Sequence, residues 1–195
     1  DVRILAAGSD ASLQLFLYKL SKNAPASAQI TRIRTEYTPG DMPFPDFRIL
    51  KSSEKRIDTP IMSPDLPLCD ACRRELFDEE NRRYQYPFIS CVDCGPRYSI
   101  LTGVPYDRET TSMDEFAMCD ACAAEYKGVD RRMHAQTISC TDCGPQPIFI
   151  SHEDIKEKQQ AIDACISSIQ SGEVVAMKGI GGYHLVCLPS RSDTV

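Results

Sequence analysis

Apolar and polar residues in the first fifty positions follow two different periods. Residues 11–20 place leucine and phenylalanine at helical spacing directly after Asp10, which predicts a helix capped by Asp10. Phe47 and Ile49 alternate with polar neighbours, so they are expected to face inward from a strand. The predicted strands are residues 2–5, 29–37 and 47–50. A helix among strands indicates part of an α/β sandwich, and a ferredoxin-like βαββαβ fold completes it most simply.

The C-terminal part of the chain predicts a helix followed by a strand. Ser151 and Asp154 resemble an N-terminal capping pair. A helical stripe of isoleucines begins at Ile155 and is expected to end at Gly172. Residues 173–188 then predict a strand, a glycine-rich turn and a second apolar segment, which together would open an α/β domain.

The glycine-rich turn, KGIGG at residues 178–182, resembles a phosphate loop but lacks the Gly-Lys-Ser/Thr ending. A tight turn is the simpler interpretation. A lysine and several backbone amides at the end of a strand can nevertheless bind an anion, so Lys178 is a candidate contact. His184, beside the turn, is a second candidate.

Residues 51–68 separate these patterns from the middle of the chain. They are charged and contain Pro60, Pro64 and Pro67, which suits an extended connector. We therefore expect a domain boundary there.

The middle of the chain is dominated by cysteine. Eight of the ten cysteines form four Cys-x-x-Cys pairs, separated by 18, 24 and 17 residues. The pairs are Cys69/Cys72, Cys91/Cys94, Cys119/Cys122 and Cys140/Cys143. CDACRREL recurs as CDACAAEY, ISCVDCGP recurs as ISCTDCGP, and an Arg-Arg pair lies within each copy. The second half is therefore a duplicate of the first, displaced by 50 residues at the first pair (119 minus 69) and by 49 at the second (140 minus 91).

This spacing is typical of two four-thiolate zinc sites, because two Cys-x-x-Cys turns complete one tetrahedron. Gly95 and Gly144, each following a second cysteine, are expected to take positive φ and close the turn around the sulfurs. Four thiolates leave no open coordination position, so the predicted role is structural. Disulfides, redox-active pairs and iron-sulfur clusters are the alternatives, but none requires this duplicated spacing.

Two pairings of the cysteines are open at this point. Local pairing places the four cysteines of each repeat on one zinc ion, whereas crossed pairing would interleave the repeats. Independent duplicated modules favour the local arrangement. With either pairing, the bound zinc would contribute folding free energy to a segment that is too small to bury a large core.

Charge argues against nucleic acid as the partner of the cysteine-rich segment. The chain has a net charge of -6, and residues 67–150 carry 9 Lys and Arg against 14 Asp and Glu. Zinc modules that bind nucleic acid usually present a basic surface. The arginine pairs Arg82/Arg83 and Arg131/Arg132 lie near the cysteines and are expected to offset thiolate charge.

The composition also bears on location. No stretch approaches the roughly 18 apolar residues of a membrane span, which predicts no membrane contact. So many thiols suit a reducing cytoplasm. The chain begins at Asp1 without a methionine and ends soon after a new element starts, so we expect an internal piece of a longer protein.

The cysteine spacing and the phrases RRYQYPFISCVDCGPRYSI, VPYDRETT, DRRMHAQTISCTDCGP and MKGIGGYHL resemble the HypF family of hydrogenase maturation factors over essentially the whole chain. The resemblance implies an α+β multidomain fold. Its predicted parts are the C-terminal part of an acylphosphatase-like domain (1–52), a linker (53–66), a double zinc-finger domain (67–150) and the start of a YrdC-like α/β domain (151–195).

The resemblance also implies a function. HypF-type proteins use carbamoyl phosphate and ATP to form carbamoyl adenylate and then carbamoylate the C-terminal cysteine of HypE, the source of a cyanide ligand in [NiFe] hydrogenases. Lys178, Tyr183 and His184 would then line a nucleotide or carbamate pocket, although this chain alone is expected to be inactive. The alternatives are a zinc-dependent protein-interaction module without activity and RNA contact through the YrdC-like part.

Overall fold

A computed structural model describes most of the chain. The described residues are 2–24, 28, 30–38, 40, 44–50, 62–152, 154–179, 181–192 and 194. The chain divides into two compact units, residues 1–56 and 57–195. Most of the predicted linker falls outside the described residues, and the three boundaries between the four predicted parts stay predictions.

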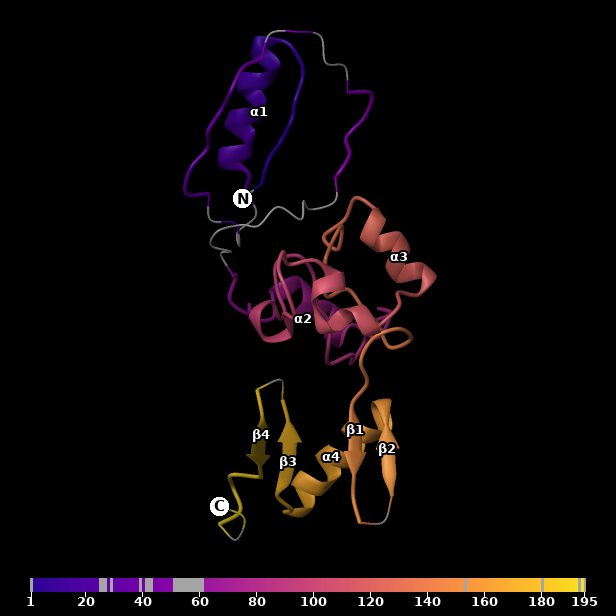
Figure 1. Ribbon diagram of the computed structural model, residues 1–195. Helices are drawn as coiled ribbons and strands as arrows, with labels where there is room; N and C mark the ends of the chain where they lie inside the picture. Colours follow the sequence, from indigo (N-terminus) through magenta and orange to yellow (C-terminus); the bar gives the residue numbers. More distant parts are fainter. Residues whose placement is uncertain are drawn as a thin grey trace. The chain divides into compact units, whose positions relative to one another are not determined.

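The first unit contains the predicted helix. Helix α1 (Asp10–Lys22) is capped by Ser9, whose hydroxyl accepts a hydrogen bond from the backbone amide of Ser12 at 3.3 Å (Figure 1). Asp10 lies inside the first turn, so the cap is one residue earlier than predicted. Asp10 there and Lys22 in the last turn both match the helix dipole.

The strands predicted around α1 are not formed in the described part of this unit. Extended backbone runs beside the helix (Figure 1), and the residues of this unit that the structure describes form no strand ladder. The expectation that Phe47 and Ile49 face inward is wrong, since they are 80% and 52% exposed. Alternating apolar residues bury a face only where a paired strand and a covering layer are both present, and the described residues supply neither.

Two similar modules follow in the second unit. Helix α2 (Asp70–Phe77) begins directly after Cys69, and α3 (Asp120–Lys127) begins directly after Cys119. In both repeats the chain turns back through a residue with positive φ, Gln85 at 53° and His134 at 55°. The connection between the modules carries the short 3-10 helices η1 (Tyr98–Ile100), η2 (Arg108–Thr110) and η3 (Ser112–Glu115).

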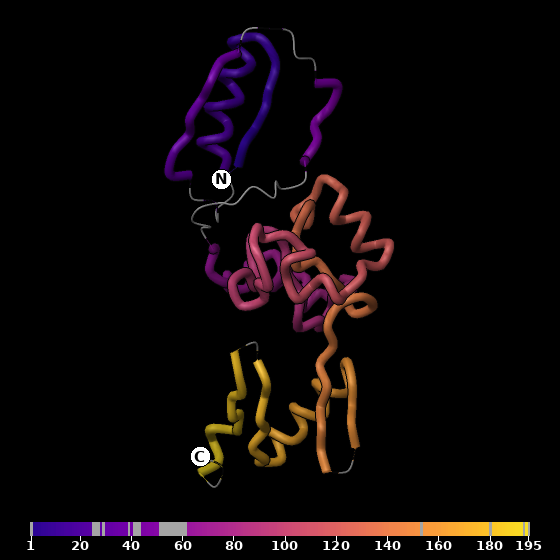
Figure 2. The backbone as a smooth tube through the Cα atoms, viewed as in Figure 1, coloured from indigo at the N-terminus to yellow at the C-terminus, as the bar shows by residue number. Residues whose placement is uncertain are grey.

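The turns that follow the two helices are also equivalent. The amide of Gln85 donates to the carbonyl of Leu76 at 2.8 Å, and the amide of His134 donates to the carbonyl of Tyr126 at 3.0 Å. Each repeat surrounds its own small buried cluster, of which the cysteines are a part. Figure 2 shows the two repeats side by side. The duplication in sequence is therefore a duplication in backbone.

The C-terminal part contains two antiparallel hairpins and a helix. Strand β1 (Ile148–Ile150) pairs with β2 (Ile155–Glu157), helix α4 (Lys158–Ser171) follows, and β3 (Val175–Lys178) pairs with β4 (Tyr183–Val186). Helix α4 ends at Gly172, as predicted, with φ of 93°. Gly179, Gly181 and Gly182 lie in the turn between β3 and β4, and the amide of Gly179 donates to the carbonyl of Gly182 at 2.7 Å, which agrees with the tight-turn interpretation.

The predicted start of α4 is wrong. Ser151 and Asp154 close the β1–β2 hairpin instead: the amide of Asp154 donates to the Ser151 hydroxyl at 3.1 Å. Ile155 lies in β2 and pairs with Ile150. Serine and aspartate side chains satisfy backbone groups in turns as readily as at helix caps, so this pair did not distinguish the two.

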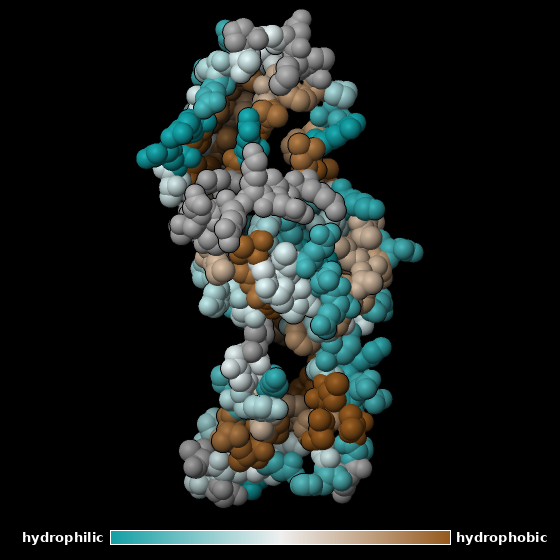
Figure 3. All heavy atoms as spheres, in the orientation of Figure 1, coloured by the Kyte–Doolittle hydropathy of each residue, from teal (hydrophilic) through white to brown (hydrophobic). Residues whose placement is uncertain are grey.

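Apolar side chains are exposed on this C-terminal part, where Figure 3 shows brown surface over the hairpins. The exposed apolar residues there include Ile148, Ile150, Ile155, Val174, Met177 and Leu185. None of the helices in the described ranges is long and apolar enough to span a bilayer.

Candidate metal centres

The eight paired cysteines gather into two clusters, one in each repeat. The first repeat (residues 69–94) supplies the first cluster, and the second repeat (residues 119–143) supplies the second. Within each cluster all four sulfur atoms lie within 4.8 Å of one another. The clusters are Cys69, Cys72, Cys91 and Cys94, and Cys119, Cys122, Cys140 and Cys143. This is the grouping that local pairing predicts.

The distances in the first cluster fit a tetrahedral metal ion. Cys69 Sγ lies 3.7 Å from Cys91 Sγ, Cys91 Sγ lies 3.8 Å from Cys94 Sγ, and Cys94 Sγ lies 3.5 Å from Cys72 Sγ. Four sulfurs at about 2.3 Å from a central zinc ion would be separated by about 3.8 Å. The cluster therefore has the dimensions of a zinc site.

The second cluster has the same dimensions. Cys140 Sγ lies 3.8 Å from both Cys119 Sγ and Cys143 Sγ. A disulfide requires a sulfur separation of about 2.05 Å, and all ten cysteines are free thiols. The disulfide alternative is therefore not what the structure shows.

The start of each module helix positions two sulfurs. Cys69 and Cys119 occupy the N-cap positions of α2 and α3, and Cys72 and Cys122 lie in the first turns. At the first helix the sulfur of Cys69 accepts a hydrogen bond from the backbone amide of Cys72 at 3.5 Å. A Cys-x-x-Cys sequence thus forms a helix start and a pair of ligands together.

Gly95 and Gly144, which follow the last cysteine of each repeat, are required for different reasons. Gly95 has φ of 93°, as predicted. Gly144 does not take positive φ, so that prediction is wrong. A Cβ atom at Gly144 would lie 2.1 Å from the hydroxyl of Tyr86 and 2.4 Å from Cβ of Ser139. Close packing, and not the backbone angle, requires glycine in the second repeat.

Tyr86 explains that packing. It belongs to the first repeat, is buried, and donates to Ser139 Oγ at 3.2 Å in the second repeat. Its equivalent in the second repeat is Ala135 (135 minus 86 gives 49), which has no hydroxyl. Burial raises the pKa of Tyr86 to about 12, so the residue stays a neutral donor.

Arginine side chains cross between the repeats. Arg82 belongs to the first repeat but contacts the second cluster: its guanidinium lies 3.5 Å from the sulfurs of Cys119 and Cys122 and 3.2 Å from the sulfur of Cys140. It also forms an ion pair with Glu125 at 3.0 Å.

Arg83 follows the same path and is almost completely buried, with 2% exposure. Its Nε donates to the carbonyl of Ser139 at 2.8 Å, and its Nη2 donates to Glu125 at 2.5 Å and to Cys122 Sγ at 3.5 Å. A buried guanidinium with all these partners in the other repeat holds the two modules together.

The reverse crossing uses the equivalent residues of the second repeat. Arg131 donates to Cys72 Sγ at 3.0 Å and pairs with Glu75 at 2.6 Å. Arg132 also pairs with Glu75, and its Nε donates to the carbonyl of Ser90 at 3.1 Å. Each arginine pair therefore serves the opposite repeat.

The two glutamates at the centre of these contacts are ionised. Burial opposes ionisation of Glu75, but hydrogen bonds from Arg132 and Arg131 outweigh it and lower its pKa to about 2. The pKa of Glu125 is lowered in the same way, against burial, by Arg83 and Arg82.

The thiols favour a bound cation. Hydrogen bonding with Cys72 lowers the pKa of Cys94, and a backbone hydrogen bond at Cys122 lowers that of Cys119. The pKa of Cys72 is raised, first by its hydrogen bond with Cys91. Four crowded thiols cannot all ionise alone, whereas a divalent cation at the centre of each cluster would favour all four thiolates.

The segment between the repeats is fixed by Arg108, in the VPYDRETT stretch. Its Nη1 donates to the carbonyls of Gln136 at 2.8 Å and Ile138 at 3.0 Å, and its Nη2 donates to that of Phe116 at 2.6 Å. All three acceptors are carbonyls of the connection or the second repeat, so this arginine packs the connection onto that repeat.

The three predicted nucleotide contacts lie on the β3–β4 hairpin. Lys178 and Tyr183 are cross-strand partners, so their side chains share one face of the hairpin. His184 pairs with Met177 and lies on the opposite face. The hairpin brings two of the three together, and their contact with a ligand stays a prediction.

The cysteine spacing predicted the two groups of sulfurs that the structure brings together, but it did not predict several residues that surround them. Glu75 and Glu125 recur at the 50-residue offset of the first cysteine pairs, which was the available signal. Tyr86 has alanine at its equivalent position, and Arg108 lies in the connection outside both repeats, so the duplication gave no signal for either residue. The arginine pairs were predicted to offset thiolate charge, but the sequence did not indicate that each pair contacts the cysteines of the opposite repeat.

Known proteins match these features. The HypF finger family model matches residues 68–101 and 118–150. A protein of Methanocaldococcus jannaschii named "Probable carbamoyltransferase HypF" is 40% identical over 197 residues, covering 100% of this chain and 26% of its own length. Carbamoyltransferase HypF of Rhodobacter capsulatus is 39% identical over 182 residues, covering 92% and 24%.

Two solved structures agree. Full-length HypF in its phosphate- and nucleotide-bound form matches with a TM-score of 0.85 and 37% identity, over 96% of this chain and 24% of that one. T. kodakarensis HypF matches with a TM-score of 0.76 and 38% identity, over 92% and 22%. This chain spans about a quarter of the length of the curated relatives it matches. The family-model match and the identity of about 40% over almost the whole chain show that it belongs to the HypF family.

Proposed function

We propose that this chain is the zinc-bearing segment of a carbamoyltransferase and that its eight paired cysteines bind two structural zinc ions. The observation that supports this most directly is the pair of closed four-sulfur clusters with tetrahedral spacing, in a chain about 40% identical to HypF carbamoyltransferases. Neither cluster leaves a position for a substrate. The zinc ions would hold a scaffold and take no part in the reaction.

The carbamoyl transfer would be carried out by a longer protein, one as long as the HypF relatives. There, carbamoyl phosphate and ATP would give carbamoyl adenylate, and the carbamoyl group would pass to the C-terminal cysteine of HypE in the cytoplasm. An intermediate that water destroys needs an enclosed path between sites. A rigid pair of modules beside the catalytic domains would help to maintain such a path.

Within this chain, the hairpin residues are the proposed contacts to nucleotide or carbamate. Lys178 and Tyr183 share a face on which a cation and a phenol could meet an anionic ligand. His184 would act from the other face, and a single ligand would not touch all three without a change of geometry. The chain alone, without further domains, would not catalyse the transfer.

The interaction-module alternative receives less support. The matches cover essentially the whole chain, including the residues on both sides of the cysteines, and the relatives are named for an enzymatic activity. A free interaction module would require similarity only over the cysteine-rich part. RNA contact gains no support from the acidic charge of the chain, -6 overall.

The test uses the longer protein with purified HypE. Intact-mass analysis would follow carbamoylation of the HypE C-terminal cysteine with carbamoyl phosphate and ATP, and metal analysis would give zinc content. We expect transfer to require both substrates and to fail in Cys122→Ser, with Cys165→Ser as the matched control outside the clusters. Transfer without ATP, or full transfer in Cys122→Ser, would contradict the proposal.

A further inference from the structure

The arginine contacts are exchanged between the repeats in both directions. Within the described part of the chain, every contact between an arginine guanidinium and a cysteine sulfur joins one repeat to the other cluster. Local repetition alone would have allowed each arginine pair to serve its own cluster. The exchange therefore makes the surroundings of each metal site depend on the folding of the other repeat.

The position of Arg82 depends on the first cluster. The arginine lies in the loop between the two cysteine pairs of the first repeat, whose ends are Cys72 and Cys91. The loop is held by hydrogen bonds from Tyr84 to Asn81 at 2.8 Å and from Gln85 to the end of α2. If the first cluster lost its ion, both ends of this loop would be released.

The dependence also runs in the opposite direction. The loop of the second repeat carries Arg131, whose carbonyl accepts a hydrogen bond from the backbone amide of Val92 at 3.2 Å. Val92 lies between the two cysteines of the second pair of the first cluster. Release of the second cluster would thus disturb a sulfur contact and a backbone contact at the first.

We propose that the two metal sites form one thermodynamically coupled unit, in which Arg82 and Arg131 are positioning residues that transmit the loss of one ion to the other site. The ligands are local, but their hydrogen-bonding partners are exchanged. Coupling between sites is reciprocal, so each ion would raise the affinity of the other. This inference rests on the proposed zinc binding.

A thermodynamic cycle on the 195-residue chain tests the coupling. Zinc-loaded protein would be titrated with a competing chelator, and the released thiols would be alkylated and mapped by peptide mass spectrometry, so that each cluster is measured separately. The variants are Arg82→Ala, Cys72→Ser and the two combined.

We expect Arg82→Ala to weaken zinc binding at the second cluster by about 10–100-fold, the range for residues that hydrogen-bond metal ligands. Cys72→Ser should abolish the first site and weaken the second by a similar factor. The combined variant should weaken the second site no further, since both changes remove the same contacts. If the two effects multiply, the coupling through Arg82 is contradicted.

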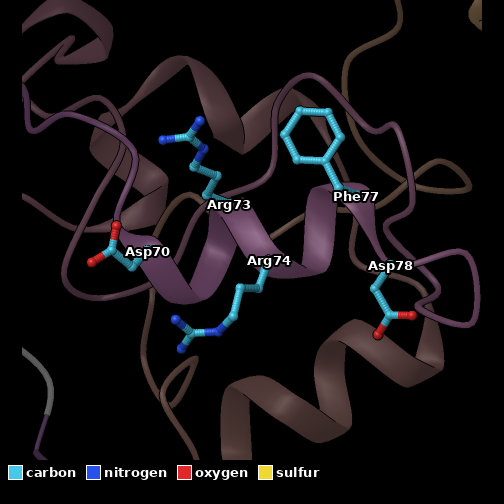
Figure 4. A pocket seen from close by; sticks show the side chains of 5 residues that line it. All are labelled: Asp70, Arg73, Arg74, Phe77 and Asp78. Atoms are coloured by element: carbon cyan, nitrogen blue, oxygen red, sulfur yellow. The ribbon is translucent and has the colours of Figure 1, made fainter.

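The matched control is Arg74→Ala. Arg74 is an exposed arginine of the same repeat, and its side chain points outward from α2, as does that of Arg73 (Figure 4). Its loss should leave both affinities within about twofold of the parent, within the usual range for surface changes. An equal loss in Arg74→Ala and Arg82→Ala would mean that overall charge, and not the contact, sets the affinity.

Arg82→Lys is a second, conservative variant, and circular dichroism checks that each variant is folded. Lysine retains the charge but not the planar fork, so we expect an intermediate loss at the second cluster in a folded chain. Failure of the parent to bind zinc would overturn the proposed metal sites. Two bound zinc ions with unchanged affinity at the second site in Arg82→Ala and Cys72→Ser would overturn only the coupling.

Discussion

The two cysteine clusters have the same ligand spacing but different surroundings. Three cysteines of the first cluster are buried, against two of the second, but each cluster packs with two buried apolar residues, Tyr86 and Ile89 at the first and Ala135 and Ile138 at the second. The guanidinium contacts differ more: the second cluster receives four, three of them from Arg82, whereas the first receives one, from Arg131. Duplication preserved the cysteines and their apolar neighbours, while the more exposed cluster receives more donated charge.

The largest expected effect comes from removing a ligand. Cys94→Ser and Cys143→Ser each delete one sulfur, the first buried and the second half-buried. Structural zinc contributes about 10–16 kcal/mol of apparent binding free energy, so each variant should lose its own ion and partly unfold. Metal analysis with thiol mapping would measure this. Retention of full zinc by either variant would contradict the assignment of that ligand.

Removing a carboxylate between the arginines should be the next largest effect. Glu125→Gln leaves the buried Arg83 without its charge partner, and Glu75→Gln does the same to Arg132. We expect a loss of about 2–4 kcal/mol in the free energy of unfolding, since breaking a buried pair leaves an uncompensated charge. Urea unfolding of the zinc-loaded chain would measure it.

The two glutamate variants also separate the clusters. Glu125→Gln should release zinc mainly from the second cluster, and Glu75→Gln mainly from the first, because each carboxylate holds the arginines at the cluster of its own repeat. Glu79→Gln, an exposed change in the first repeat, is the matched control. Equal release from both clusters in all three variants would contradict the contact-based account.

The glycines after the second cysteines offer a smaller test. Gly144→Ala should destabilise the chain by about 1–3 kcal/mol through overpacking. Tyr86→Phe removes the atom nearest to the new methyl group, so it should recover part of that loss. Gly95→Ala should be insensitive to Tyr86→Phe, since its strain comes from φ of 93° and from Ser90. Equal recovery of both glycine variants would contradict the distinction.

The smallest effect concerns pH. The pKa of Glu75 is lowered from 4.5 to about 2, so its contribution to stability is fully present above pH 4.5 and is lost as the pH falls from there towards 2. The difference in unfolding free energy between the parent and Glu75→Gln should therefore stay constant between pH 7 and about pH 5. A difference that had already halved by about pH 5.5 would show that Glu75 is not held by Arg131 and Arg132.

The two groups of cysteines could be predicted because zinc coordination fixes both residue type and short spacing. Cys-x-x-Cys forms a helix start at Cys69 and at Cys119, and the duplication then implied a local grouping. The exchange of arginines could not be predicted. Identical loops can reach their own cluster or the opposite one, and only the packing of one repeat against the other decides between them.

The errors have equally specific causes. Gly144 follows a cysteine just as Gly95 does, but its requirement comes from Tyr86, which lies 58 residues earlier (144 minus 86). Ser151 and Asp154 fit a helix cap and a hairpin turn equally well. Phe47 alternates with polar residues, yet no ladder partner is present among the described residues. At Gly144 and Phe47 the deciding contacts are long-range and absent from the local pattern, whereas at Ser151 and Asp154 the same local residues suit two structures.

The two proposed zinc sites are tested most directly by zinc K-edge X-ray absorption on the purified chain, combined with metal analysis. We expect two zinc ions per chain, one for each cluster, and four sulfur neighbours per ion at about 2.3 Å. One ion per chain, or nitrogen or oxygen in the first shell, would contradict two closed four-thiolate sites.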